Sequence, residues 1–168
     1  MNYNIDIKTS LNHEKELVTS QSFKEKLLDV LANLIKLSDD PHHPIAAIVF
    51  ENNKIIGSGN AHYIPDNNVG YIFPNEKIPA RSIMNTKYPY MIHAEMDAIT
   101  QCKTNIQNAS IIVTYFPCNE CAKLIIASGI KEVIYTELPD LTKERYILAN
   151  ILFTIAGVKT YFIDEYFK

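Results

Sequence analysis

Two short segments carry side chains whose types and spacing suit metal-assisted chemistry. The first is His93-Ala94-Glu95, and the second is the run Pro117-Cys118-Asn119-Glu120-Cys121. One imidazole and two thiols are good ligands for a tetrahedral Zn²⁺, and they leave the fourth position to a water molecule, as catalytic zinc sites do. We therefore predict that His93, Cys118 and Cys121 bind zinc.

Glu95 stands two residues after the histidine, and it is the candidate general base and acid for that water. The order H-x-E followed by P-C-x-x-C is typical of zinc enzymes that deaminate nucleobases. Either half alone could equally be a core histidine or a pair of buried thiols. Because each half occurs once here and in this order, the sequence predicts a zinc-dependent hydrolase that removes an amino group.

Both segments are expected at helix starts. We place His93 and Glu95 in the first turn of one helix, and Cys118 and Cys121 in the first turn of another, which Pro117 opens. The unpaired N–H groups and the helix dipole at such a position favour the carboxylate and thiolate forms.

Apolar patterns along the chain predict the elements that position these segments. Residues 1–21 lack a firm period and are expected to be an irregular lead-in to a single domain over residues 22–168. A helix is expected from its N-cap Ser22 to about Leu37, because apolar residues recur at helical spacing. We then expect a hairpin over 45–58 turning at Asn52-Asn53, strands at 109–116, 130–136 and 158–163, and helices at 93–102, 117–128 and 142–156.

Helices between the last strands imply parallel crossovers. The predicted fold is therefore α/β: a three-layer αβα sandwich with a mixed five-stranded sheet and helices on both faces. The two ligand-bearing helices should lie side by side on one face. Residues 59–90 are too long for a plain connection, and we expect them to wall the active site.

Composition limits the partners and the location. The 168 residues are 47% hydrophobic and 21% charged, which suits one globular core. No signal peptide or membrane span is predicted, and three cysteines, two of them assigned to zinc, argue against a disulfide framework. We expect a cytoplasmic protein without a membrane partner. The net charge of −3 argues against a nucleic-acid partner, but not against a small anionic substrate.

The chain resembles the cytidine deaminase superfamily, and within it the deoxycytidylate deaminases, over residues 24–163. Three stretches carry most of the likeness: Lys87-Tyr88-Pro89-Tyr90, His93-Ala94-Glu95-Met96 and residues 116–134. The resemblance implies a cytidine-deaminase-like fold, Zn²⁺ in each subunit, a nucleotide substrate and a homo-oligomer. It implies the conversion of dCMP to dUMP with release of ammonia.

The resemblance also suggests substrate contacts. The backbone groups of Ala94 and Phe116 are candidates to hold the pyrimidine, and Asn60 is a candidate for a sugar hydroxyl, although it could equally be a turn residue. Tyr90, like its neighbour Tyr88, could stack on the base or pack against the zinc helix. The basic residues Arg81 and Lys87 could reach a 5′-phosphate or remain on the solvated surface.

Two departures and two alternatives accompany this prediction. The family's glycine-rich turn is altered at residues 57–61, and Asp97 stands where asparagine is usual. Another base, nucleoside or modified pyrimidine nucleotide could be the substrate, or the chain could be a catalytically inactive binding protein. The loop residues His42, His43 and His62 could hold a second metal, or be ordinary polar histidines.

Overall fold

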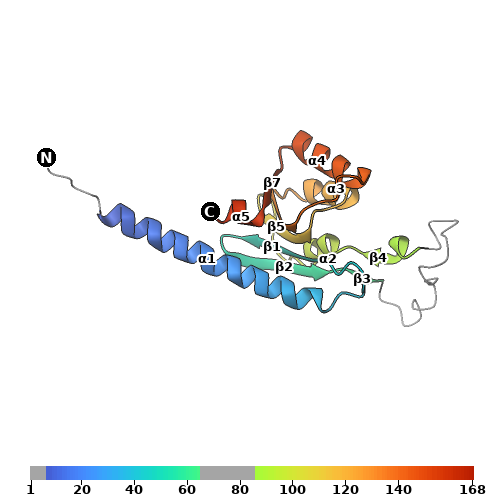
Figure 1. Cartoon of the computed structure of the whole chain (residues 1–168), viewed down its shortest axis with the longest axis horizontal. Coiled ribbons are helices and arrows are strands. Elements are labelled where there is room, and N and C mark those ends of the chain that lie inside the picture. The colour runs from blue at the N-terminus through green and yellow to red at the C-terminus, as the bar shows by residue number, and fades with distance from the viewer. Residues whose placement is uncertain (1–6, 65–85) are drawn as a thin grey trace.

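The computed structural model describes residues 7–64 and 86–168, with side chains from residue 20 onward in those ranges. Its centre is a five-stranded sheet in the order β2-β1-β5-β6-β7 (Figure 1). The strands are β1 Ala46–Glu51, β2 Lys54–Asn60, β5 Ser110–Tyr115, β6 Glu132–Glu137 and β7 Lys159–Phe162. Strand β1 is antiparallel to both β2 and β5, whereas β5, β6 and β7 are parallel, so the predicted mixed sheet is confirmed.

The β1–β2 hairpin forms where the asparagine pair predicted it. Asn52 and Asn53 have positive φ angles of 49° and 59°, the backbone of a two-residue turn that matches the twist of its strands. Asparagine tolerates this left-handed conformation better than most residues. Five consecutive residues of β1 are buried, because the strand lies inside the sheet and is covered on both faces.

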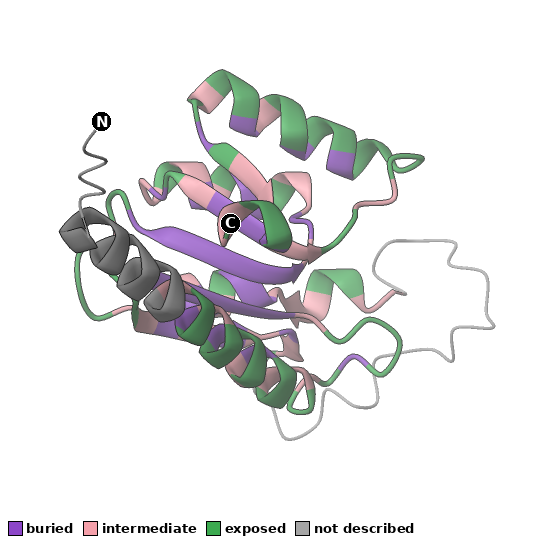
Figure 2. Cartoon of the chain, turned by 60° about the vertical axis from the view of Figure 1, so that its left-hand side comes forward, coloured by how far each residue is buried: buried purple, intermediate pink, exposed green. Residues whose placement is uncertain are grey.

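Helices cover both faces of the sheet, as expected. Alternate strand residues such as Val49, Ile111 and Val133 pack against α2 Ala94–Thr100, α3 Asn119–Ala127 and α4 Glu144–Ala156. Their neighbours Ile48 and Ile112 pack against α1 Ile7–Ile35 and the short α5 Ile163–Tyr166. Figure 2 shows the result, with buried strands between helices whose outer faces are exposed.

The start of α1 corrects one prediction. The helix begins at Ile7, so residues 7–21 are helical rather than an irregular lead-in, and Ser22 lies inside the helix instead of capping it. No glycine or proline interrupts Ile7–Ile35, and its first half is rich in Glu, Lys and Leu, which favour helix. Figure 1 shows the N-terminal turns running past the edge of the sheet, where no periodic core contact marks them in the sequence.

The segment expected to be irregular contains short elements. β3 His62–Tyr63 pairs with β4 Met91–Ile92, and a 3-10 helix, η3, covers Tyr88–Tyr90. Such two- and three-residue elements have no period that a sequence pattern could show. Residues 65–85, which include Arg81, lie outside the described residues. Within the described part of the chain, no helix is both long and apolar enough to span a bilayer.

Candidate functional site

The three predicted metal ligands are carried by the starts of α2 and α3. His93 is the residue before α2, and Cys118 is the residue before α3, both with extended backbone; Cys121 lies one turn further along. Neither cap side chain makes a capping hydrogen bond to its own helix. The predicted first-turn positions are therefore confirmed for Glu95 and Cys121, whereas His93 and Cys118 lie one residue earlier, at the caps, and Pro117 precedes the cap rather than opening the helix. Because neither the His93 nor the Cys118 side chain caps its helix, both are available as ligands.

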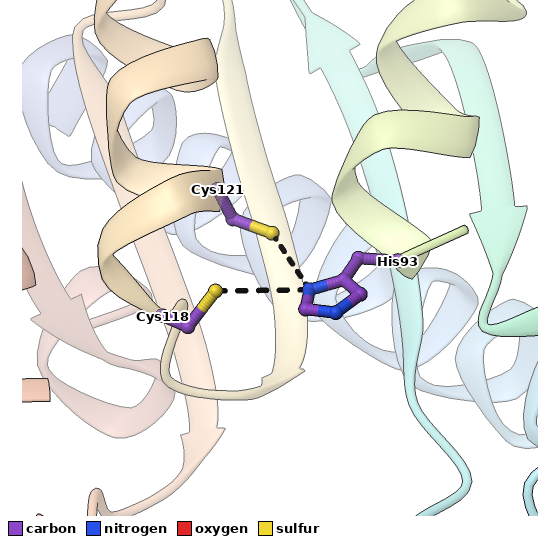
Figure 3. Close-up of side chains that lie close together, drawn as sticks. All are labelled: His93, Cys118 and Cys121. Carbon is purple, nitrogen blue, oxygen red and sulfur yellow. Dashed lines mark hydrogen bonds between the residues drawn. The ribbon is translucent and has the colours of Figure 1, made fainter. Parts of the chain in front are cut away.

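These side chains converge on one point. The Nδ1 atom of His93 lies 3.2 Å from the Cys121 Sγ and 3.7 Å from the Cys118 Sγ (Figure 3). With Zn–N near 2.05 Å and Zn–S near 2.3 Å, tetrahedral coordination places nitrogen and sulfur ligands about 3.6 Å apart. The observed separations lie on either side of this value, so the donor set fits a zinc ion.

The two thiols share one negative charge. The pKa of Cys118 is lowered to about 4 because the Cys121 S–H donates to it and His93 lies beside it, although burial opposes the shift. The same contact, together with burial and the charge of Glu95, raises the pKa of Cys121. The contact with Cys118 also raises the pKa of His93 against the effect of burial. A cation beside the pair would favour ionisation of both thiols, the form that binds zinc.

Glu95 lies in the first turn of α2 and is only 4% exposed. Burial raises the pKa of its carboxyl group, and the negative charge on Cys118 adds to this effect, while backbone hydrogen bonding and His93 oppose it. A carboxylate whose pKa is raised accepts a proton more readily than an ordinary surface carboxylate does. The structure thus places a proton carrier beside the three ligands.

A single cavity contains most of the predicted site. The residues named from the sequence that line it are His43, Lys87, Tyr88, His93, Ala94, Glu95, Phe116 and Cys118. Cys121 is buried behind the cavity wall, in contact with His93. The loop before β1 also lines the cavity, and so do Ala61, Lys87 and Tyr88, so the expectation that residues 59–90 wall the site holds for both of their described ends.

Two predicted substrate contacts are not brought into this cavity. The Asn60 side chain donates to the Leu37 carbonyl at 3.0 Å and lines a separate surface groove between β2 and α2. Tyr90 does not line the cavity, whereas its neighbour Tyr88 does. A third predicted contact, Arg81, lies outside the described residues.

Sequence reasoning missed the β6–α4 connection. Lys143, Arg145 and Tyr146 line the cavity from the start of α4. They lie far along the chain from the zinc ligands and carry no motif. The topology alone could have indicated them. Ligands bind beyond the carboxyl ends of parallel strands, and this connection follows the carboxyl end of β6.

A buried ion pair fixes the cavity wall. The Lys87 ammonium lies 2.9 Å from the Asp40 carboxylate, whose side chain is 7% exposed. The same carboxylate accepts hydrogen bonds from the backbone N–H groups of His42 and His43. Burial alone would raise the pKa of Asp40, but these bonds outweigh it and lower the pKa. The pair ties the loop before β1 to the segment that leads into His93.

Asp97, whose role the sequence left open, holds α2 against β2. Its carboxylate accepts the backbone N–H of Asn60 at 3.2 Å. The two glycines of β2 allow this approach, because a Cβ on Gly57 would meet the Ala98 carbonyl and one on Gly59 would lie 2.8 Å from the Ala94 carbonyl. The altered turn therefore still brings the helix that begins at the zinc ligand close to the sheet.

The loop histidines form no second metal site in the part of the chain that the structure describes. There, His93, Cys118 and Cys121 are the one group of three ligand-type side chains close enough to share an ion. Of the three loop histidines, His43 lines the cavity, where its ring packs edge-to-face on Tyr115 at 5.6 Å.

Comparison with known proteins gives related sequences and folds. A sequence model for the "cytidine and deoxycytidylate deaminase zinc-binding region" matches residues 21–137. Deoxycytidylate deaminase from Homo sapiens is 41% identical over 123 residues, covering 72% of this chain and 68% of the human protein. Probable deoxycytidylate deaminase from Drosophila melanogaster is 33% identical over 130 residues, covering 74% and 64%.

Solved structures share the fold. The dCMP deaminase from the cyanophage S-TIM5, in complex with dCMP and dUMP, superposes with a TM-score of 0.61 at 20% identity, over 84% of this chain and 96% of that one. A diaminohydroxyphosphoribosylaminopyrimidine deaminase/5-amino-6-(5-phosphoribosylamino)uracil reductase from Thermotoga maritima gives a TM-score of 0.58 at 22% identity, over 88% of this chain and 38% of that one. These likenesses confirm the predicted deaminase-like sandwich.

Proposed function

This chain belongs to the family of cytidine and deoxycytidylate deaminases with a zinc-binding region, and from that membership we propose that it hydrolyses dCMP to dUMP and ammonia. One observation carries the proposal. The ligand atoms of His93, Cys118 and Cys121 lie within 4.8 Å of one another, and the buried Glu95 lines the same cavity. A structural zinc site has no need for that carboxyl group, so its presence argues against an inactive binding protein.

His93, Cys118 and Cys121 would hold the zinc ion. A zinc ion with three protein ligands supplies hydroxide at neutral pH by lowering the pKa of water. Cys121 is buried, whereas His93 and Cys118 line the cavity, so a zinc ion held by the three residues would be accessible to water and substrate from the cavity. The protein therefore brings the nucleophile and the base of the substrate together in one enclosed space.

Glu95 would carry the protons. It accepts one from the attacking water and delivers it to N3 of the cytosine ring as the new C4–O bond forms. It then takes the remaining hydroxyl proton to the amino nitrogen, which leaves C4 as ammonia when the C–N bond breaks. Because Glu95 is buried beside the ligands, the proton stays inside the site between the two transfers.

Ala94 and Phe116 would orient the pyrimidine. Ala94 is the first residue of α2, where a backbone N–H has no partner within the helix and can donate to the O2 atom of the base. Phe116 follows β5 and is 5% exposed, with its ring packed edge-to-face on Tyr135 at 5.1 Å. Its backbone carbonyl is thus held in a rigid position from which it can accept from the substrate amino group.

The test is ammonia release by the zinc-loaded protein from a panel of substrates: dCMP, CMP, deoxycytidine, cytidine, cytosine, guanine and adenosine. We expect dCMP to give the highest kcat/KM. Turnover of a different heterocycle alone would contradict the substrate assignment and leave the zinc chemistry in place. Absence of turnover with every compound would contradict the enzyme assignment.

Three further properties are proposed with the activity. The catalytic domain spans residues 22–168, and the protein works as a homo-oligomer in the cytoplasm. The family relationship supports an oligomer. So does the α4 apolar stripe, which consists of Ile147, Leu148, Ile151 and Ile155, all between 43% and 79% exposed. A continuous apolar patch on a helix is typical of a contact with another protein surface. The location stays a prediction.

A further inference from the structure

We propose that Arg145, with Lys143 beside it, binds the 5′-phosphate of the substrate. This inference rests on the proposed function, because it assigns the second end of the same nucleotide. The sequence pointed instead to Arg81 and Lys87. The cavity lined by His93 and Cys118 has Lys143 and Arg145 in its wall, at the start of α4.

The cavity has a buried end and an exposed end. Ala94, Glu95 and Phe116 are at most 5% exposed and form its floor beside the zinc ligands. Lys143, Arg145 and Tyr88 are exposed and form its mouth. A nucleotide whose base reaches the floor must leave its phosphate near the mouth, since the sugar lies between them. Basic side chains that bind the phosphate should therefore lie at the mouth.

Of the described cations at the mouth, Arg145 is the most available. Lys87 is held by the buried Asp40 carboxylate at 2.9 Å, so a phosphate would have to compete with that ion pair. Lys143 makes a longer contact of 3.4 Å with Asp140, in which both side chains are well exposed, and such pairs are weak. Among the described residues, no carboxylate forms an ion pair with Arg145.

Aromatic rings orient the Arg145 guanidinium. Its central carbon lies 5.5 Å from the Tyr146 ring centroid and 5.9 Å from that of Tyr88. Contact through the ring faces leaves the N–H groups at the edge of the guanidinium to donate to an oxyanion. The Tyr146 ring is in turn packed edge-to-face on Tyr115 at 5.3 Å, so the side chain that orients Arg145 is itself fixed.

Hydrogen bonds hold the loop that leads into Lys143 and the first turn of α4. The backbone N–H of Asp140 donates to the Tyr115 hydroxyl at 2.9 Å. The Asp140 carboxylate accepts from the backbone N–H and the hydroxyl of Thr142 at 3.1 and 2.6 Å. A preformed loop loses little freedom on binding, which favours recognition of the phosphate.

The experiment compares kcat/KM for dCMP and deoxycytidine in the full-length zinc-loaded protein. In Arg145→Gln we expect the ratio of the two values to fall about tenfold or more, as loss of a charge-assisted bond predicts. Arg145→Lys should recover part of the ratio, because it keeps the charge but not the planar fork. Lys143→Ala should reduce it less. Lys123→Ala is the matched control, since Lys123 also pairs with an acid three residues earlier but lies on the outside of α3.

Equilibrium binding separates this inference from the reaction. Calorimetry with dUMP and with deoxyuridine measures the phosphate contribution even in a protein that does not turn over. We expect wild type to prefer dUMP, and Arg145→Gln to lose most of that preference. An unchanged preference in Arg145→Gln, or its loss in Arg81→Ala alone, overturns the assignment. A dUMP preference that depends on Arg145 without any deamination would support this inference and contradict the proposed reaction.

Discussion

In the proposed mechanism the Glu95 carboxyl group both accepts and delivers protons. Glu95 is buried and its pKa is raised. In Glu95→Gln we expect zinc content to stay at one per chain, because the ligand set is intact. Deamination should fall by about 10²–10⁴-fold, since the amide cannot transfer a proton. Metal analysis and ammonia release measure the two effects.

Glu120→Gln is the control for that substitution. Glu120 lies next to Cys121 but points to solvent, where it pairs with Lys123 at 2.7 Å. It should keep both zinc and activity. A Glu95→Gln protein with more than about a tenth of wild-type turnover would show that another group moves the protons.

The three cysteines offer a test of the ligand assignment. Cys118→Ala and Cys121→Ala should each lose zinc and activity together, because two remaining ligands hold the ion poorly. Cys102→Ala should keep both, since the Cys102 thiol donates to the Ala98 carbonyl at 3.3 Å, on the far side of α2 from the site. The zinc content of each variant, measured by atomic emission, tests the ligand assignment. One zinc per chain in Cys121→Ala would refute the assignment.

At the scale of elements, the contact between β2 and α2 sets the position of the site. Helix α2 begins directly after His93 and carries Glu95, and it lies close to β2 at the two glycines. In Gly59→Ala the new methyl group would press on the α2 backbone, which must shift. We expect a loss of about 1–3 kcal/mol in the free energy of unfolding, weaker zinc binding and lower activity. Urea denaturation and zinc titration measure these effects.

Ser58→Ala is the matched control. Ser58 lies between the two glycines, and because side chains alternate along a strand it faces away from α2. The free energy of unfolding of Ser58→Ala should differ from that of wild type by no more than about 0.5 kcal/mol. Equal losses in the Ser58 and Gly59 variants would mean that the strand, rather than its contact with the helix, is sensitive.

The sequence predicted those elements whose local pattern agrees with their place in the fold. The apolar β-branched strands, the Asn52-Asn53 turn and the ends of the helices predicted over 117–128 and 142–156 agree with the structure to within a residue or two, because each depends on neighbouring residues. The start of α1 was missed, because residues 7–21 are helical but show no apolar period in the sequence. Of the site, His93, Glu95, Cys118 and Cys121 share a spacing that chemistry requires. Arg145 is brought to them only by the path of the chain through β6.

At the scale of the whole molecule, the α4 apolar stripe is exposed to solvent in a single chain. Ile151→Glu places a charge at its centre, and we expect the protein to dissociate into smaller species in light scattering or sedimentation. Asn150→Glu adds the same charge to α4 outside the stripe and should leave the assembly intact. An assembly that is unchanged in Ile151→Glu would locate the subunit contact elsewhere.

Because His93 lies far along the chain from Cys118 and Cys121, a zinc ion bound by the three residues would also link the stability of the fold to the supply of zinc. The ligands are 25 and 28 residues apart in the chain, so an ion shared by them acts as a cross-link that closes a loop through β5. Closing a loop of that length in the unfolded chain costs about 3.5 kcal/mol of entropy. Because the folded chain alone offers this geometry, mass action couples the metal supply to the amount of folded protein: each tenfold rise in free zinc above the dissociation constant adds about 1.4 kcal/mol.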